Sequence, residues 1–268
     1  MLLKTINRNI LFSLLKFHVK TIKFNFCLRN INTRTVLGIE TSCDETGIAI
    51  VDENGNLISD VCHSQLQIHL DYGGIIPPVA RNLHKFNIDS CVKRTFEKTQ
   101  MKPDQISAIA VTVKPGLSLS LLIGKNYAQT LALKYSKPLI PIHHMEAHAL
   151  TVMMENPQVK FPFLTLLISG GHCIIAVVKG IDDFLLLGQS VDDAPGDILD
   201  KISRRLKLRN LGEPFNRISG GQAIELLAKS GNELAYFTNP QLFPLKQRTC
   251  NFSFAEFNGK VLRLIETL

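Results

Sequence analysis

Three features are missing from this sequence: acidic residues near its start, long apolar runs and closely spaced cysteine pairs. No aspartate or glutamate precedes Glu40 in the 268 residues. No run of about 18 apolar residues occurs anywhere, which excludes a membrane-spanning helix and predicts no stable membrane insertion. The six cysteines include no C-x-x-C pair, which is typical of free thiols in a reducing compartment.

The excess of positive charge lies at the start of the chain. Residues 1–35 hold seven of the 30 Lys and Arg residues and none of the 23 acidic residues, so the remainder has equal numbers of both. Within this leader Leu3, Ile6, Ile10 and Leu14 share one face of a helix. A basic, acid-free amphipathic helix is typical of a mitochondrial transit peptide. We expect delivery to the mitochondrial matrix; a helix lying on a membrane surface or docked on the fold is the alternative.

The remainder of the chain contains one pattern twice. Between residues 36 and 61, three apolar runs are separated by a polar turn and by Asn54-Gly55, a strong hairpin signal. Residues 164–187 repeat this order, and Ile48 aligns with Ile174 at an offset of 126 residues. We interpret the repeat as a structural duplication, in which each copy opens an α/β lobe with a three-strand meander.

The duplication predicts a first α/β lobe over 36–160 and a second over 161–268. Strands that alternate with helices predict a mostly parallel sheet in each lobe. The turns at the carboxyl ends of the strands are then candidate ligand loops, and the two lobes would face each other across a cleft. The elements expected between the two meanders are a helix over 82–98, a strand over 106–113, a helix over 118–135 and a strand over 138–142.

Two histidines follow the last of these strands. His144 and His148 are spaced i, i+4, so on a helix both imidazoles leave one face, close enough to share a metal ion. The pattern is not H-E-x-x-H, because Glu146 lies in the middle and points off that face, which disfavours a zinc protease. Partly buried polar packing is the alternative interpretation of such a pair.

A glycine-containing turn follows the first strand of the second repeat. Ser169-Gly170-Gly171 comes directly after an apolar run, and glycines there let backbone N–H groups approach a phosphate or carbonyl oxygen. A plain hairpin turn is the alternative. A binding function is favoured because this turn occupies the position that residues 41–45 take in the first repeat.

A third group of polar residues runs from Asp192 to Lys201. Asp193 is the predicted N-cap of a helix, and Asp197 lies in its first turn, where an acid favours the helix dipole. Asp200, one turn later, either hydrogen-bonds a ligand or lies on a solvated face. The basic residues that follow could contact an RNA backbone, but a solvated face is favoured for Lys201, Arg204, Arg205, Lys207 and Arg209.

Together, these segments resemble the tRNA N6-adenosine threonylcarbamoyltransferase family (also called O-sialoglycoprotein endopeptidase-like), in particular its mitochondrial branch. The match runs in order through most of the chain, from about Val36 to Phe254. The matching segments are Leu37–Thr46, Tyr72–Pro77, Lys114–Leu117, His144–His148, Leu167–His172, Asp192–Asp197 with Asp200 and Lys201, Ser219–Gly221 and Phe252–Phe254.

The resemblance implies a two-lobed fold of the actin-like, sugar-kinase-like and Hsp70-like superfold. It implies transfer of a threonylcarbamoyl group from threonylcarbamoyl-AMP to N6 of adenosine 37, forming t6A in mitochondrial tRNAs that read codons beginning with A. A separate synthase would make the adenylate, and the transferase would act as a homodimer.

The resemblance also implies roles for individual residues. His144 and His148 would be ligands of one divalent metal ion (Fe, Zn or Mg), which would orient and polarise the adenylate. Asp44 and Glu45 would be weak acid–base candidates, and no catalytic residue is assigned. The residues that would contact the adenylate are Leu167, Ile168, Ser169, Gly170 and Gly171, with Asp200 on the ribose hydroxyls and Gly221 at a close backbone approach.

The chain departs from the family pattern in three places. Pro78 stands where the family has Glu, and Lys114 stands where it has Gly. After Phe254 the family continues Ser-Gly-Leu-Lys and runs on through much of the second lobe, whereas this chain reads Ala255-Glu-Phe-Asn-Gly-Lys and lacks the late Asp-Asn motif that supplies a third metal ligand. We therefore expect an incomplete second lobe with an unpaired apolar sheet edge, weak metal binding and impaired catalysis, as in a truncated or alternatively spliced form.

Other functions remain open at this point. The chain could be a non-catalytic partner that pairs with a full-length enzyme through the first lobe. It could also be a nucleotide-dependent kinase or ATPase of the same superfold, although the histidine pair disfavours this, since such enzymes place carboxylates around Mg²⁺. A metallopeptidase is disfavoured because no Glu is positioned as its general base.

Overall fold

A computed structural model describes residues 34–232 and 249–267 of the chain. The chain divides into two compact units between Lys160 and Phe161. Strand β1 (Thr35–Glu40) already begins at the last residue of the predicted leader, whose residues 1–33 lie outside the described part. Among the helices that are described, none is long and apolar enough to cross a membrane.

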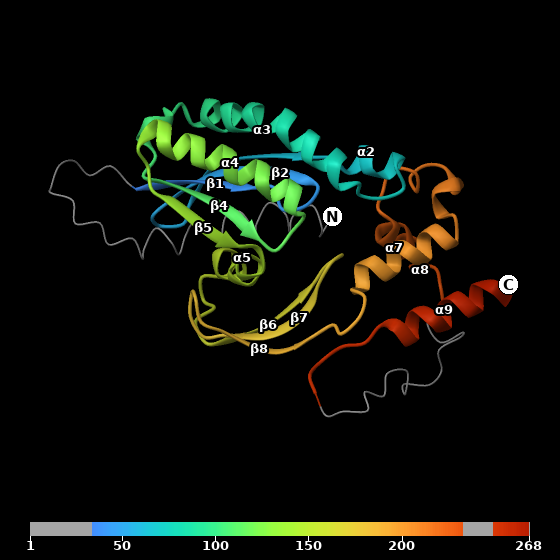
Figure 1. The fold of residues 1–268 in the computed structure, drawn as a ribbon. Helices are drawn as coiled ribbons and strands as arrows, with labels where there is room; N and C mark the ends of the chain where they lie inside the picture. Colours follow the sequence, from blue (N-terminus) through green and yellow to red (C-terminus); the bar gives the residue numbers. More distant parts are fainter. Residues whose placement is uncertain (1–33, 233–248, 268) are drawn as a thin grey trace. The chain divides into compact units, whose positions relative to one another are not determined.

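The first unit is built on a mixed sheet of β1, β2 (Glu45–Asp52), β3 (Leu57–Ser64), β4 (Ala108–Lys114) and β5 (Leu139–His143). Its strand order is β3-β2-β1-β4-β5 (Figure 1). The first three strands form the expected antiparallel meander, while β4 and β5 run parallel to β1. The prediction of a mostly parallel sheet is therefore wrong, because short turns reverse the chain directly and only a long crossover yields a parallel neighbour.

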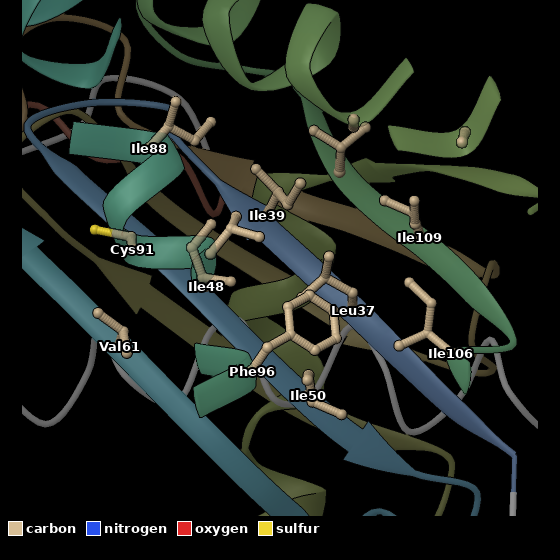
Figure 2. Packing of buried hydrophobic residues seen from close by; sticks show 14 residues of the cluster. Leu37, Ile39, Ile48, Ile50, Val61, Ile88, Cys91, Phe96, Ile106 and Ile109 are labelled. Atoms are coloured by element: carbon tan, nitrogen blue, oxygen red, sulfur yellow. The ribbon is translucent and has the colours of Figure 1, made fainter. Parts of the chain in front are cut away.

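Helices cover both faces of this sheet. α3 (Pro77–Thr99) and α4 (Ser118–Tyr135) pack on one face, and α5 (His144–Leu150) and α6 (Val152–Glu155) lie on the other (Figure 1). Alternate residues of each strand point to opposite faces, so the unit has two apolar layers. The layer beneath α3 and α4 is the larger one (Figure 2) and includes Leu37, Ile39, Ile48, Ile50, Ile88, Phe96 and Ile109.

The boundaries of the long helices follow local sequence signals. α4 spans the predicted residues 118–135. α3 begins at Pro77, five residues before the predicted start at residue 82. Pro77 and Pro78 occupy the first turn, where a missing N–H costs nothing because it would have no helical partner. Three short helices of this unit were not predicted: α2 (Leu66–Asp71), the 3-10 turn η1 (Pro103–Gln105) and α6.

The second unit also begins with a meander. β6 (Phe163–Ile168), β7 (Cys173–Val178) and β8 (Phe184–Gln189) pair in that order and are all antiparallel. The expected parallel arrangement is therefore wrong for the described strands of this unit too. One face of β6 is exposed and apolar, with Leu164, Leu166 and Ile168 at 61%, 52% and 58% exposure.

Three helices and a 3-10 turn follow this sheet: α7 (Pro195–Arg205), η2 (Leu208–Leu211), α8 (Gly220–Ala228) and α9 (Ala255–Thr267). α7 is the central helix of the unit, since it packs against both α8 and α9. Ile198 and Ile202 are buried residues of this helix. The five cysteines in the described part of the chain are free: Cys43, Cys62, Cys91, Cys173 and Cys250.

Candidate functional site

The predicted histidine pair lies at the carboxyl end of the parallel strands of the first unit. β5 ends at His143, and α5 begins at the next residue, His144. β1 ends at Glu40. Because β1, β4 and β5 are parallel neighbours, their carboxyl ends meet at one edge of the sheet, where α/β proteins commonly bind ligands. His144 therefore lies beside Glu40, although 104 positions separate them in the sequence.

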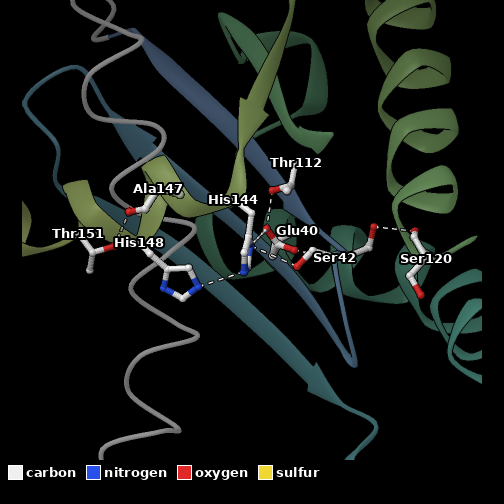
Figure 3. A network of polar contacts seen from close by, with 9 residues as sticks. Glu40, Ser42, Thr112, Ser120, His144, Ala147, His148 and Thr151 are labelled. Atoms are coloured by element: carbon white, nitrogen blue, oxygen red, sulfur yellow. Dashed lines mark hydrogen bonds and ion pairs between the residues drawn. The ribbon is translucent and has the colours of Figure 1, made fainter. Parts of the chain in front are cut away.

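The two imidazoles face each other across one turn of α5 (Figure 3). Nε2 of His148 lies 3.0 Å from Nε2 of His144, and the ring planes are perpendicular. Two nitrogen lone pairs repel at this distance, so the pair needs a proton on one nitrogen or a cation bound to both. Nitrogen atoms that share one tetrahedral zinc ion at about 2.0–2.1 Å lie about 3.3 Å apart, slightly farther than the 3.0 Å between these two. The spacing therefore fits a shared ion, and the metal-binding role stays a prediction.

Glu40 is the buried carboxylate beside this pair. The Ser42 backbone N–H donates to Oε1 at 2.5 Å, the Thr112 hydroxyl donates to Oε2, and Nδ1 of His144 lies 3.3 Å from Oε2. Burial raises the pKa of Glu40, but the hydrogen bond and charge of His144 and the hydrogen bonds from Ser42 and Thr112 lower it to about 2. Glu40 is therefore ionised at neutral pH and acts as a hydrogen-bond acceptor.

The turn after β1 is fixed by backbone contacts with the start of α4. Leu117 N–H donates to the Ser42 carbonyl at 2.7 Å, and the Thr41 hydroxyl donates to the Ser120 carbonyl at 2.9 Å. Gly116 has φ +152°, and a Cβ there would lie 2.5 Å from the Ser42 carbonyl oxygen. The Lys114–Leu117 segment thus holds Ser42 in place, with its hydroxyl 3.2 Å from Nδ1 of His144.

The donor set of the first unit fits part of a metal site. Two imidazole nitrogens converge from one helix, and the carboxylate behind His144 is the arrangement that commonly orients a metal-bound histidine. Within the described residues, however, no group of three or more His, Cys, Asp or Glu side chains could hold an ion. Two ligands provide a partial site, and any further ligands would come from substrate, water or residues outside the described part.

The turn that carries Asp44 and Glu45 is anchored by a buried histidine. Nδ1 of His84 lies 2.8 Å from the Thr46 hydroxyl, and Nε2 lies 2.9 Å from the Cys43 carbonyl oxygen. Burial lowers the pKa of His84, against the hydrogen bond to Cys43 and the charges of Glu40 and Asp44. His84 is therefore neutral and holds both ends of the turn. Asp44 and Glu45 are each partly exposed.

The Ser169-Gly-Gly turn of the second unit is closed by its own serine. Oγ of Ser169 accepts the N–H groups of Gly171 and His172 at 3.2 and 3.0 Å. A Cβ on Gly170 or Gly171 would meet nothing within 4 Å, so among the described residues no neighbouring atom excludes a larger side chain at either position. The open space and the short side chains leave the outer surface of the turn accessible to a ligand.

The helix α7 brings the predicted nucleotide-binding residues of the second unit together. Gly196, in its first turn, packs against the Ser169-Gly170 backbone, where a Cβ would lie 2.7 Å from Gly170 Cα. One turn later Oδ1 of Asp200 accepts the Gly221 N–H at 2.8 Å. Burial raises the pKa of Asp200, and the hydrogen bond from Gly221 opposes this. Asp200, on α7, therefore contacts the first residues of α8 and is not on a fully solvated face.

Three other acidic residues of this segment have structural contacts. The N-cap of α7 is Ala194, so the prediction of Asp193 as N-cap is wrong. Asp193 instead pairs with Lys201 at 2.8 Å, and Asp197 pairs with the same ammonium at 2.7 Å. Asp192 accepts hydrogen bonds from the Ser253 hydroxyl and from the Phe254 and Ala255 N–H groups, which attaches the start of α9 to the sheet end.

The sequence analysis assigned no role to several residues that support these sites, although Glu40, Gly196 and Gly220 lie in segments that match the family. Glu40 and Thr112 are separated from His144 in the sequence and carry no spacing signal. Gly196 and Gly220 support α7, and a Cβ on Gly220 would lie 2.7 Å from Oδ1 of Asp200. Glu40 could have been found from its position, because it is the last residue of β1 and the carboxyl ends of strands were already candidate ligand positions.

The family model for tRNA N6-adenosine threonylcarbamoyltransferase matches residues 56–268, and the chain belongs to this family. The mitochondrial tRNA N6-adenosine threonylcarbamoyltransferase of Mus musculus is 54% identical over 221 residues, which are 82% of this chain and 52% of the mouse protein. The Danio rerio protein of the same name is 55% identical over 229 residues, 85% of this chain and 55% of that protein. The chain spans about half the length of these curated relatives.

A more distant relative is bacterial. The tRNA N6-adenosine threonylcarbamoyltransferase of Persephonella marina is 38% identical over 231 residues, 86% of this chain and 64% of that protein. YeaZ from Pseudomonas aeruginosa is a solved structure with a TM-score of 0.40 and 15% sequence identity over 57% of this chain and 63% of that chain. The resemblance to the family and to its mitochondrial branch is thus confirmed, and the relatives' names agree with the predicted mitochondrial location.

Proposed function

We propose that this protein transfers a threonylcarbamoyl group from threonylcarbamoyl-AMP to N6 of adenosine 37 in mitochondrial tRNAs, forming t6A. The observation that carries the proposal is the ordered set of family motifs in a chain that is 54% identical to a mitochondrial relative with this name. We further propose that it works in the mitochondrial matrix after removal of a transit peptide, as a homodimer. The convergent histidine pair supports the proposal, since a plain α/β scaffold has no need of it.

His144 and His148 would hold one divalent metal ion through their Nε2 atoms, which face each other at 3.0 Å. When bound, the cation would polarise the carbonyl or phosphate oxygens of the adenylate and stabilise the negative charge that develops there. Within this chain, Glu40 and Ser42 would orient the His144 ring through their contacts with its Nδ1 atom. The roles of these residues are therefore to place the imidazoles and to keep their geometry fixed.

The second unit would bind the adenylate. Leu167 and Ile168 end β6, and the exposed turn of Ser169, Gly170 and Gly171 follows, where a Cβ would meet nothing on either glycine. A carboxylate has two oxygens, so Asp200 can hold the Gly221 N–H with Oδ1 and accept a ribose hydroxyl with Oδ2. Asp200 belongs to α7, and the Ser169-Gly170 backbone packs against Gly196 of the same helix. The helix would therefore keep a constant distance between the turn and the Asp200 carboxylate.

The transfer itself requires one bond to form and one to break. The N6 nitrogen of the adenosine would attack the carbonyl carbon of the carbamoyl group, a C–N bond would form, and the C–O bond to AMP would break. The N6 nitrogen loses a proton in this step. Asp44 and Glu45 are the candidates to accept it, since they are partly exposed in a turn that His84 keeps rigid.

The experiment is a direct assay of product. The full chain is incubated with threonylcarbamoyl-AMP, Zn²⁺, Fe²⁺ or Mg²⁺ and an unmodified tRNA that reads codons beginning with A, and t6A nucleoside is measured by mass spectrometry. His144→Ala and His148→Ala should each lower product formation at least about 100-fold, because a metal ligand contributes more than the 10–100-fold typical of its supporting partners. Glu146→Gln, on the same helix, is the matched control and should retain activity.

The absence of t6A with every metal would refute the proposal for this chain acting alone. In that case, size-exclusion chromatography with a full-length relative distinguishes the non-catalytic partner, which co-migrates, from a protein of unrelated function, which does not. Product formed equally well by His144→Ala would instead leave the transfer in place and refute the metal role of the pair.

A further inference from the structure

We propose that Glu40 is a positioning residue, which holds His144 in the tautomer with its proton on Nδ1 and thereby presents the Nε2 lone pair to a cation. The proposal deepens the proposed function and rests on it for the cation. Glu40 lies at the end of β1 and His144 at the start of α5, so neither helix nor strand alone creates the contact. Figure 3 shows the Glu40 carboxylate beside Nδ1 of His144, while His148 lies beside Nε2 of the same ring.

The first step of the argument is that Glu40 is surrounded by donors. Its side chain is 10% exposed, and its oxygens accept the Ser42 N–H and the Thr112 hydroxyl. A buried carboxylate is stable only where its lone pairs are satisfied by donors. Nδ1 of His144, 3.3 Å from Oε2, is the remaining contact, and a lone pair at this position would repel the carboxylate.

The second step concerns the serine hydroxyl, which could favour the opposite tautomer. Oγ of Ser42 lies 3.2 Å from Nδ1 of His144 and could in principle donate to an unprotonated nitrogen. That arrangement would place the Nδ1 lone pair against Oε2 of Glu40, an oxygen that already acts as an acceptor for the Thr112 hydroxyl. With the proton on Nδ1, by contrast, the N–H is shared between Oε2 of Glu40 and Oγ of Ser42, and both contacts are favourable.

The third step follows for the pair itself. A proton on Nδ1 leaves Nε2 of His144 as a lone pair, directed at Nε2 of His148 at 3.0 Å. Without a cation, His148 must then donate from Nε2, and a bound cation takes the place of that proton. Carboxylate–histidine pairs behind a metal ligand work in this way, by setting the tautomer and ring orientation.

The substitution Glu40→Gln keeps the shape of the side chain but replaces one acceptor oxygen with an NH₂ donor, which should reverse the tautomer of His144. The amide oxygen of Gln can accept the Ser42 N–H, and its NH₂ group then faces Thr112 and His144. An NH₂ group donates, so Nδ1 of His144 becomes the acceptor and its proton moves to Nε2, the atom that should bind the cation. Glu146→Gln makes the same chemical change on α5, outside the hydrogen bonds around Glu40, and serves as the control.

The first measurement reads the tautomer directly in the metal-free full chain. Two-bond ¹H–¹⁵N spectra of the imidazoles, with His144→Ala used to assign the signal, should place the His144 proton on Nδ1 in the wild type and in Glu146→Gln. It should move to Nε2 in Glu40→Gln. A wild-type His144 with its proton on Nε2 overturns the proposal, and this result needs no substitution at Glu40 to fold.

The second measurement is the affinity for Zn²⁺ alone, obtained by isothermal titration calorimetry. Glu40→Gln should bind Zn²⁺ about 10–100-fold more weakly than the wild type, as for other partners of metal-bound histidines, and Glu146→Gln should bind like the wild type. In a His144→Ala background, Glu40→Gln should change the affinity less than about twofold, because the effect passes through that ring. Wild-type affinity in Glu40→Gln overturns the proposal. If the wild type binds no Zn²⁺, the metal part of the proposed function fails, and the tautomer measurement alone decides the role of Glu40.

Discussion

His84 is a fully buried histidine whose replacement should change both the stability of the first unit and its dependence on pH. Its ring connects the Thr46 hydroxyl, at 2.8 Å, to the Cys43 carbonyl, at 2.9 Å. Glutamine can replace one of these hydrogen bonds but not both. A buried group left without a partner costs about 1–3 kcal/mol, so His84→Gln should lower the free energy of unfolding by about that amount at pH 8.

The pH dependence follows from the direction of the pKa shift. Burial lowers the pKa of His84 below its usual 6.5, and the charge of His69 adds to this, against the Cys43 hydrogen bond and the charges of Glu40 and Asp44. Above about pH 6.5 the ring is neutral in both states and contributes no slope. Below it, the unfolded chain binds a proton that the folded chain does not, so stability falls by up to about 1.4 kcal/mol per pH unit.

The assay is urea unfolding between pH 5 and 8, combined with hydrogen exchange of peptides from β2 and α3, so that the first unit is followed separately. Burial also lowers the pKa values of His69 and His143, so the informative quantity is the difference in slope between variants. His84→Gln should show a smaller loss of stability on acidification than the wild type. Lys85→Gln, an exposed change on the same helix, should keep the wild-type slope. Equal slopes in wild type and His84→Gln would refute the reasoning.

The remaining predictions concern the second unit. Gly220→Ala should destabilise it by about 1–3 kcal/mol, as overpacking does, because the new Cβ would lie 2.7 Å from Oδ1 of Asp200. Gly221→Ala, whose Cβ would have its nearest neighbour at 3.8 Å, should cost much less, and a larger loss for Gly221→Ala in thermal melts contradicts the packing. Asp192→Ala removes the acceptor of the Ser253 hydroxyl and of two N–H groups at the start of α9. Peptides from residues 249–267 should then exchange amide hydrogens faster, and unchanged protection would show that other contacts hold α9.

The sequence predicted the elements whose signals are local. The two meanders follow from apolar runs separated by short turns, and α4 from a continuous helical stretch, so both could be predicted without knowledge of the fold. The direction of the strands could not, because it depends on whether a connection crosses the sheet. The start of α3 at Pro77 shows the same limit on a smaller scale, since proline reads as a break in sequence but is tolerated in a first helical turn.

The candidate sites divide in the same way. The spacing of His144 and His148 already placed two imidazoles on one helix face, and their order among the other motifs indicated the family. The spacing said nothing of Glu40, because a contact across 104 positions depends on the pairing of β1, β4 and β5. Nor did it distinguish Gly220 from Gly221, since the distance of each from Asp200 is set by how α7 packs against α8.

The sequence by itself therefore determined the local elements, the histidine pair and the family, because periodicity, turn chemistry and ordered motifs are properties of neighbouring residues. The tertiary structure decided which groups surround that pair. Glu40 and Ser42 reach His144, and Thr112 reaches Glu40, because parallel strands bring their carboxyl ends to one edge of the sheet. Burial at that edge leaves a carboxylate that must find donors within the protein, and the imidazole is one of them.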